Sequence, residues 1–77
     1  MPLIDHDSDV PVYIQLAGIL RGQIERGEVT GRVPSAKTLA QSYVVAVGTA
    51  ERALGILRQE GVIRSAMGRG HFVIKPE

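Results

Sequence analysis

The sequence contains no cysteine, no recognisable secretion signal and no apolar run long enough to cross a membrane. Without cysteine, the chain can form neither a disulfide framework nor a thiolate metal or redox site. Its first residues are acidic and polar, whereas a secretion signal needs a basic segment followed by an apolar one. A membrane-spanning helix needs about 20 consecutive apolar residues, and no stretch approaches that length. We therefore expect a cytoplasmic protein that does not bind membranes.

Residue patterns typical of catalysis are also lacking. A chain of 77 residues makes one small domain, with little room for an enclosed active site. It carries no carboxylate pair on a shared helical face, no Ser-His-Asp or Cys-His set and no phosphate-binding loop. His6 lies among three aspartates, a composition more typical of a solvated tail than of a metal site. The sequence therefore predicts no enzyme activity, no cofactor and no bound metal.

Charge is nearly balanced, with a formal net charge of +1, but it is unevenly distributed along the chain. Residues 1–31 carry five acidic and two basic side chains, whereas residues 32–77 carry three acidic and seven basic ones. A basic portion of this kind is the electrostatic feature expected of a nucleic-acid surface. An ordinary soluble surface accounts for the same distribution, so charge alone does not decide between the two.

A first helix is predicted at residues 11–26, after a polar arm at residues 1–10. Apolar residues in this helix recur at the i, i+3, i+4, i+7 spacing of one buried face. Ser8 or Asp9 is the candidate cap at its start, and Gly27 is the candidate stop at its end.

Two further helices are predicted, joined by a short turn. Ser35 follows a proline and is the candidate cap of a helix that ends near residue 42. Residues 44–46 form the turn into the next helix, which Gly61 ends. Two short helices joined by about four residues have the spacing of a helix-turn-helix. The buried stripe of the last helix is formed by Ala50, Ala53, Leu54 and Leu57.

Residues 62–65 and 72–75 have the β-branched composition of strands. Between them, Gly68 and Gly70 flank Arg69, which predicts a hairpin tip whose backbone can approach a surface.

The order is therefore helix, helix, helix, hairpin. This order predicts a mainly α fold with a small antiparallel β-hairpin, a winged helix-turn-helix of three helices followed by a two-stranded wing. The domain is expected at residues 11–75, between the arm at residues 1–10 and a short tail at residues 76–77.

Six short blocks in a fixed order support this interpretation. They are Pro-Val-Tyr-Ile-Gln-Leu at residues 11–16, Gly-Glu-Val at 27–29, Val-Pro-Ser with Leu-Ala at 33–40, Thr-Ala-Glu-Arg-Ala-Leu at 49–54, Leu-x-x-Glu-Gly-Val-Ile at 57–63 and Gly-Arg-Gly-His-Phe-Val at 68–73. Together they resemble the N-terminal DNA-binding domain of the GntR family of bacterial transcription regulators. The resemblance covers nearly all of the chain, from about residue 11 to residue 74.

The resemblance implies that the third helix enters the major groove of double-stranded DNA and that the wing lies on a flanking minor groove or on the backbone. A two-fold operator and a homodimer follow from this geometry, with dimerisation on the DNA or through surface outside this chain. An effector ligand is expected only if the effector-binding domain of the family accompanies these residues. The alternative is a winged helix that contacts a protein or RNA.

The candidate DNA contacts lie on the second helix, on the third helix and on the wing. Ser35 and Lys37, with Arg32 just upstream, form a candidate phosphate clamp, because a helix N-terminus attracts anions. Thr49 and Arg52 are the candidate base contacts of the third helix. The full candidate set is Arg32, Ser35, Lys37, Val47, Gly48, Thr49, Arg52, Gly68, Arg69, Gly70 and His71.

The third helix departs from the family pattern at its contact face. Ala46 and Val47 stand where the family often has Ser-Arg, and Glu51 stands at a position that is often Arg. Two of the arginines that commonly recognise guanine in the family are therefore absent. We expect base recognition to depend instead on Arg52, on Thr49, on close approach of the backbone at the start of the helix, and on the wing.

Overall fold

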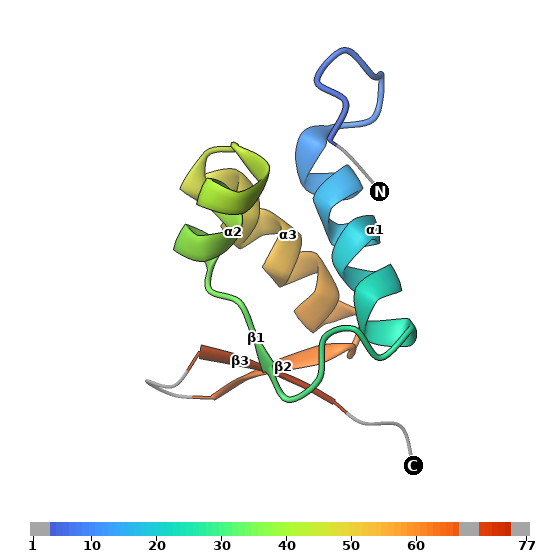
Figure 1. Ribbon diagram of the computed structural model, residues 1–77, viewed down its shortest axis with the longest axis vertical. Helices are drawn as coiled ribbons and strands as arrows, with labels where there is room; N and C mark the ends of the chain where they lie inside the picture. The colour runs from blue at the N-terminus through green and yellow to red at the C-terminus, as the bar shows by residue number, and fades with distance from the viewer. Residues whose placement is uncertain (1–3, 67–69, 75–77) are drawn as a thin grey trace.

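The computed structural model describes residues 4–66 and 70–74 of the chain. Its elements are, in chain order, α1 (Val12–Glu25), β1 (Arg32–Val33), α2 (Ala36–Tyr43), α3 (Val47–Gln59), β2 (Ile63–Ala66) and β3 (Gly70–Val73). The three helices stand on one side of a small sheet, and α3 packs against α1, α2 and β2 (Figure 1). The predicted winged helix-turn-helix is confirmed, with α2 and α3 as the helix-turn-helix pair.

The helices meet over one apolar core. The predicted stripe of α3 is buried, because Ala50, Ala53, Leu54 and Leu57 are each at most 2% exposed. Burying a leucine or isoleucine side chain contributes about 1.5–3 kcal/mol, so a few large residues hold this small domain together. The largest fully buried side chains are Leu16, Leu20, Leu54, Leu57 and Ile63.

The start of α1 differs from the sequence-based expectation. Pro11, with a φ of −54°, is the N-cap residue, and no side chain caps the helix. The Ser8 hydroxyl instead accepts a hydrogen bond from the Val10 N–H at 3.1 Å. The expected cap by Ser8 or Asp9 is therefore wrong. The proline ring fixes φ near this value, and with a ψ of 144° Pro11 stays outside the helix, which begins at Val12.

The described part of the N-terminal arm, residues 4–10, folds back onto α1 through a single side chain. Gln15 Oε1 accepts a hydrogen bond from the Asp5 N–H at 2.7 Å, and Gln15 Nε2 donates to the carbonyl oxygens of Asp5 and Val10 at 2.8 Å each. Ile4 packs against the core. Since these backbone groups and an apolar side chain are held by the helical domain, this part of the arm is continuous with it.

Both long helices end as the sequence predicts, at a glycine. Gly61 has a φ of +79°, a conformation that other L-residues rarely adopt. Its N–H donates to the carbonyl of Arg58, and the N–H of Val62 donates to the carbonyl of Leu57. These two bonds form the Schellman motif that satisfies the last carbonyls of a helix. Because Val62 belongs to this cap, β2 begins one residue later than the predicted strand.

The sheet has three strands in the order β1-β3-β2, one more than the predicted two-stranded wing. Pro34 biases Val33 to an extended conformation, and the extended segment pairs antiparallel with β3, with Arg32 opposite Phe72. Strand β3 ends at Val73, before the predicted end at residue 75, which lies outside the described residues. The connector between α1 and α2 is thus tied to the wing by backbone hydrogen bonds.

The start of α2 is as predicted. Ser35 is the N-cap residue, with φ −68° and ψ 161°, and its hydroxyl oxygen accepts a hydrogen bond from the Thr38 N–H at 3.2 Å. The end of α2 is strained, because its C-cap residue is Val44 at φ +56°. Left-handed backbone costs an L-residue roughly 1–2 kcal/mol. Val44 is 81% exposed, so burial does not offset this strain.

Val44→Gly should therefore stabilise the domain, by about 1 kcal/mol, because glycine adopts this conformation without a steric penalty. Urea unfolding followed by circular dichroism measures the change. Val47→Gly is the matched control. Val47 is also an exposed valine, but it lies in the first turn of α3 and does not have a positive φ, so glycine relieves no strain there. A lower unfolding midpoint for Val44→Gly than for the unmodified chain would contradict the strain.

Candidate nucleic-acid interface

At the N-terminus of α2, a cation lies beside backbone amides, and neither has a partner among the residues that the structure describes. The Ser35 hydroxyl accepts from the Thr38 N–H and donates to Thr38 Oγ1 at 3.0 Å, so this hydroxyl is committed to the cap. Lys37 lies in the first turn of α2, and its side chain is exposed. A cation is unfavourable at the positive end of a helix dipole, and a bound anion would remove that repulsion. Ser35 thus orders this site, and Lys37 with the first-turn amides can contact a phosphate.

The first turn of α3 is accessible and has few polar groups. Its N-cap residue is Ala46, which makes no side-chain cap hydrogen bond. Val47 is 47% exposed, and Thr49 is half-buried beside a shallow hollow that Val12 of α1 also lines. A Cβ atom at Gly48 would meet no heavy atom within 4 Å. No contact inside the domain therefore requires glycine there, although glycine weakens a helix by about 1 kcal/mol relative to alanine.

Arg52 is held by an aromatic side chain of α1. Its guanidinium carbon lies 3.9 Å from the centre of the Tyr13 ring, a close cation–π contact. Stacking uses the face of the guanidinium plane and leaves the N–H groups at its edge free to donate hydrogen bonds. The candidate guanine contact is therefore ordered by Tyr13, on the side of α3 that faces α1. No pattern in the sequence indicates this contact, because it joins residues far apart in the chain.

Tyr13→Leu and Arg52→Ala should be coupled in their effects on stability. An exposed cation–π pair contributes about 0.5–1 kcal/mol, and a double-mutant cycle isolates this amount from the effect of each single change. Urea unfolding of the two single variants and the double variant gives the coupling. Tyr13→Phe, which keeps a ring, should retain the coupling with Arg52. Simple additivity of the two substitutions would show that the stack contributes nothing in solution.

A second flank of α3 lies away from Tyr13. Val47, Glu51 and Arg58 share it by their i, i+4, i+11 spacing, and all three are exposed. Arg58 was not among the predicted contacts, although the same helical spacing places it in line with Val47. Glu51 puts a negative charge on this flank, so contacts with DNA there must come from Val47, Arg58 or the backbone.

The outer face of the sheet carries a row of one aromatic and two basic side chains. Phe72 of β3 lies opposite Arg32 of β1 and Arg64 of β2. The guanidinium carbon of Arg64 is 5.7 Å from the centre of the Phe72 ring. Arg64 was not predicted as a contact, because sequence alone does not give the strand register that pairs it with Phe72.

The wing candidates are only partly described. Gly68 and Arg69 lie outside the described residues. Gly70 begins β3 at a φ of +91°, and a Cβ atom there would lie 3.6 Å from Arg32 Nε. His71 is a half-buried strand residue opposite Val33 and Ser65. Because side chains alternate along a strand, His71 shares the inner face with Val33, away from Arg32.

Ion pairs divide the basic side chains into two groups. Arg21 donates two hydrogen bonds to the Glu60 carboxylate, at 2.8 and 2.7 Å, and Arg26 donates to Glu28 at 2.6 Å. The hydrogen bond from Arg26 lowers the pKa of the Glu28 carboxyl. Within residues 4–66 and 70–74, the other basic side chains make no ion pair. These are Arg32, Lys37, Arg52, Arg58 and Arg64.

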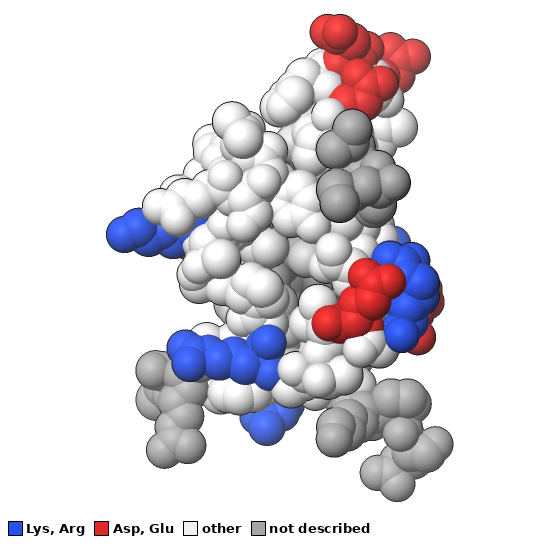
Figure 2. Space-filling model, viewed as in Figure 1, with Lys and Arg blue, Asp and Glu red and all other residues white. Residues whose placement is uncertain are grey.

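The charges are also separated in space. Figure 2 shows acidic side chains at the end formed by the N-terminal arm, a mixed group of acidic and basic side chains on one side, and basic side chains without acidic neighbours around the sheet and on the side opposite the mixed group. The basic residues without an ion pair belong to β1, α2, α3 and β2. The helix-turn-helix and the sheet therefore present cations that have no ion-pair partner within residues 4–66 and 70–74, and a bound phosphate could neutralise them.

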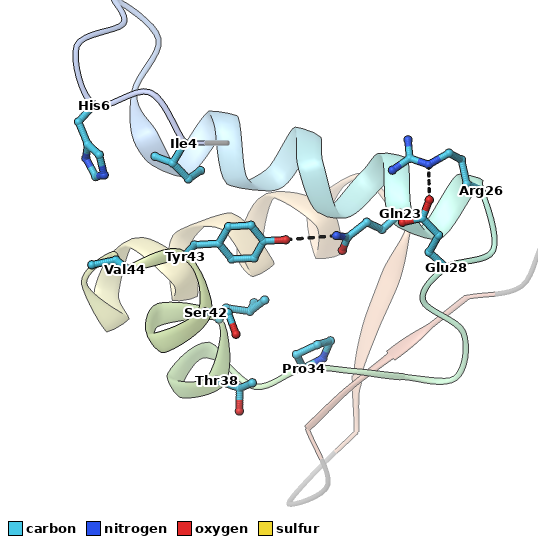
Figure 3. Close-up of a pocket in the computed structure, with 11 residues that line it drawn as sticks. Ile4, His6, Gln23, Arg26, Glu28, Pro34, Thr38, Ser42, Tyr43 and Val44 are labelled. Atoms are coloured by element: carbon cyan, nitrogen blue, oxygen red, sulfur yellow. Dashed lines mark hydrogen bonds and ion pairs between the residues drawn. The ribbon is translucent and has the colours of Figure 1, made fainter. Parts of the chain in front are cut away.

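A hollow of about 730 Å³ lies between α1, α2 and the N-terminal arm (Figure 3). Leu39 and Pro34 give it apolar walls, and Gln23 Nε2 donates to the Tyr43 hydroxyl across it at 3.2 Å. Its one carboxylate, Glu28, is held by Arg26. In the described part of the chain, no three His, Cys, Asp or Glu side chains are grouped to hold a metal ion. No described helix is both long and apolar enough to span a membrane.

Curated relatives of the chain are transcriptional regulators. The chain is 34% identical over 76 residues to the HTH-type transcriptional repressor NagR of Bacillus subtilis, and 31% identical over 77 residues to the uncharacterized HTH-type transcriptional regulator YurK of the same organism. These matches cover 96% and 97% of this chain but 31% and 32% of the relatives. The chain therefore spans about a third of their length. No protein-family model matches it.

Solved structures match the fold over nearly the whole chain. YtrA from Sulfolobus acidocaldarius, a GntR-family transcription factor, has a TM-score of 0.87 at 29% identity, covering 99% of this chain and 82% of that one. AraR(DBD), solved in complex with operator ORX1, has a TM-score of 0.83 at 26% identity, covering 94% of this chain and 93% of that one. The relatives are regulators and not enzymes, as the sequence predicted. Over nearly its whole length the chain is similar to transcriptional regulators, and it has the winged helix-turn-helix fold of GntR-family DNA-binding domains.

Proposed function

We propose that the chain binds double-stranded DNA in a sequence-dependent manner and serves as the DNA-recognition domain of a transcriptional regulator. In this proposal α3 enters the major groove, the N-terminus of α2 contacts a phosphate, and the wing lies on the flanking minor groove or backbone. The observation that carries it is the group of cations on β1, α2, α3 and β2 that make no ion pair within the described part of the chain, while Arg21 and Arg26 are neutralised by ion pairs. AraR(DBD), which shares this fold, was solved on operator DNA.

The geometry supports a different DNA contact for each element. Lys37 and the first-turn amides of α2 suit a phosphate, which sets the position of the domain on the duplex. The first turn of a recognition helix meets base edges, and here it is exposed at Val47 and Gly48. Arg52 presents guanidinium donors ordered by Tyr13, and such donors recognise guanine in a bidentate manner. The predicted contacts at Gly68, Arg69, Gly70 and His71 remain part of the proposal.

A single domain of this size makes few DNA contacts, so useful affinity needs two copies on a two-fold site. We therefore include a homodimer on DNA and a cytoplasmic location in the proposal. An effector ligand belongs to it only for a protein in which an effector-binding domain accompanies this one. Control of transcription is supported by the relatives, which are named as transcriptional regulators.

A gel shift with a random-sequence 25-base-pair DNA duplex at low salt tests the proposal. Non-specific binding driven by phosphate contacts has dissociation constants of about 1–100 μM at physiological salt and tightens as salt falls. We expect a shift at micromolar protein, and a weaker one with an RNA duplex of the same sequence, whose major groove is too narrow for a helix. No shift of DNA at tens of micromolar would favour the alternative, a winged helix that contacts protein or RNA.

A further inference from the structure

The first turn of α3 exposes an apolar side chain where a recognition helix meets base edges. Val47 is 47% exposed, Ala46 before it is exposed, and Gly48 after it has no side chain. Among the first-turn residues only Thr49 carries a polar side chain, and it is half-buried on the side toward α1. The leading part of the helix therefore offers bases mainly methyl groups, and the Thr49 hydroxyl is its one polar side-chain group.

Only one apolar group is available to such a surface in the major groove, the C5-methyl of thymine. Packed on that methyl, Val47 would bury apolar area on both partners. Packed on guanine or cytosine, it would remove water from hydrogen-bonding groups and give them no partner, which is unfavourable. A valine at this position would therefore favour an A·T pair, whose thymine methyl it can contact, over a G·C pair.

The neighbours of Val47 fit DNA as the occupant of this apolar surface. Arg58 shares its flank of α3, Lys37 is exposed at the start of the adjoining helix, and neither makes an ion pair within the described residues. Glu51, one turn after Val47 on the same flank, is the one acidic side chain of α3, so these two cations outnumber it. An apolar protein partner would have to cover these charges, whereas the phosphates beside a major groove would neutralise them. The exposed Val47 side chain complements a thymine methyl in the major groove, and the cations complement the phosphates that border that groove.

We propose that α3 recognises thymine methyl groups through Val47, so that the preferred site of this chain has A·T pairs at the positions the start of α3 meets. This inference rests on the proposed function and names the base chemistry that the domain selects. It assigns to Val47 a specificity role in place of the guanine-reading arginine that the family often has there.

Deoxyuridine provides the direct test, because it differs from thymidine only by the missing methyl. Duplexes enriched by the chain from a random 20-base-pair library supply the probe, and each thymine is replaced in turn by deoxyuridine. Burial of one methyl corresponds to about a fourfold change in affinity. We expect one such position in each half-site for the unmodified chain. For Val47→Ala the same replacement should have no effect. Val10→Ala, which changes an exposed valine of the arm, should behave as the unmodified chain does.

The outcomes separate this inference from the proposed function. If the duplexes bind and no thymine-to-uracil replacement weakens binding, the methyl contact is overturned while DNA binding stands. An equal loss for the unmodified chain and for Val47→Ala also overturns it, because another residue would then hold the methyl. If the library yields no bound duplex at low salt, the proposed function itself fails.

Discussion

Leu57→Ala should remove most of the stability of this domain. Leu57 is 0% exposed, and its helix packs against α1, α2 and β2. Large-to-small changes at such sites cost about 2–5 kcal/mol. A domain of this size has only about 3–5 kcal/mol from its single core, so the variant should be largely unfolded at 37 °C. Circular dichroism during urea titration and thermal unfolding measures the loss.

Gln59→Ala is the matched control for this substitution. Gln59 lies two residues further along α3 and is exposed, so its replacement should change stability by less than about 0.5 kcal/mol. The contrast tests whether the stripe on α3 is the structural face of the helix. A Leu57→Ala variant with an unchanged unfolding midpoint would mean that the core does not form as described.

The second large effect concerns DNA affinity. Replacing Arg32 and Lys37 together with alanine should flatten the dependence of binding on salt. Each phosphate contact contributes about 0.9 to the slope of log K against log salt, so the slope should fall by about 1.8. At 0.1 M salt the affinity should drop roughly sixtyfold. Fluorescence anisotropy with a labelled random duplex across a salt series gives both quantities.

The double substitution of Arg21 and Arg26 with alanine controls for net charge. It removes the same number of positive charges, but both side chains are held in ion pairs with Glu60 and Glu28. Its salt slope should match that of the unmodified chain. Equal slopes for both double variants would show that binding responds to total charge, and the proposed phosphate clamp would then have no support.

Features that depend on local spacing could be predicted from the sequence. The buried stripe of α3 follows from 3.6-residue periodicity, the cap at Ser35 from its place after Pro34, and the end of α3 from Gly61. Each involves residues within one or two helical turns of each other, so the pattern in the sequence is also the pattern in space. The six blocks that resemble the GntR family added the function, and relatives and solved structures support that family assignment.

Features that depend on tertiary contacts could not be predicted. Strand β1 has two residues, too few for a period-2 pattern, and it exists because β3 pairs with it. The stack of Arg52 on Tyr13 joins two helices. Val44 has a positive φ, which β-branched residues rarely adopt, so residue preference would predict a negative φ at this position. The stack of Arg52 on Tyr13 and the strained Val44 lie beside the proposed DNA surface. Functional surfaces are where departures from local preference are common.

In the proposed complex, the start of α2, the start of α3 and the wing form the DNA surface. Amide chemical-shift mapping of this chain with a selected duplex measures this surface, because the backbone amides of all elements are observed in one experiment. We predict the largest shifts at residues 35–38, 46–52 and 70–71, with small shifts along the outer side of α1, at Ile14 and Gly18. Shifts concentrated on α1, with none at the start of α3, would show that DNA binds elsewhere on the domain.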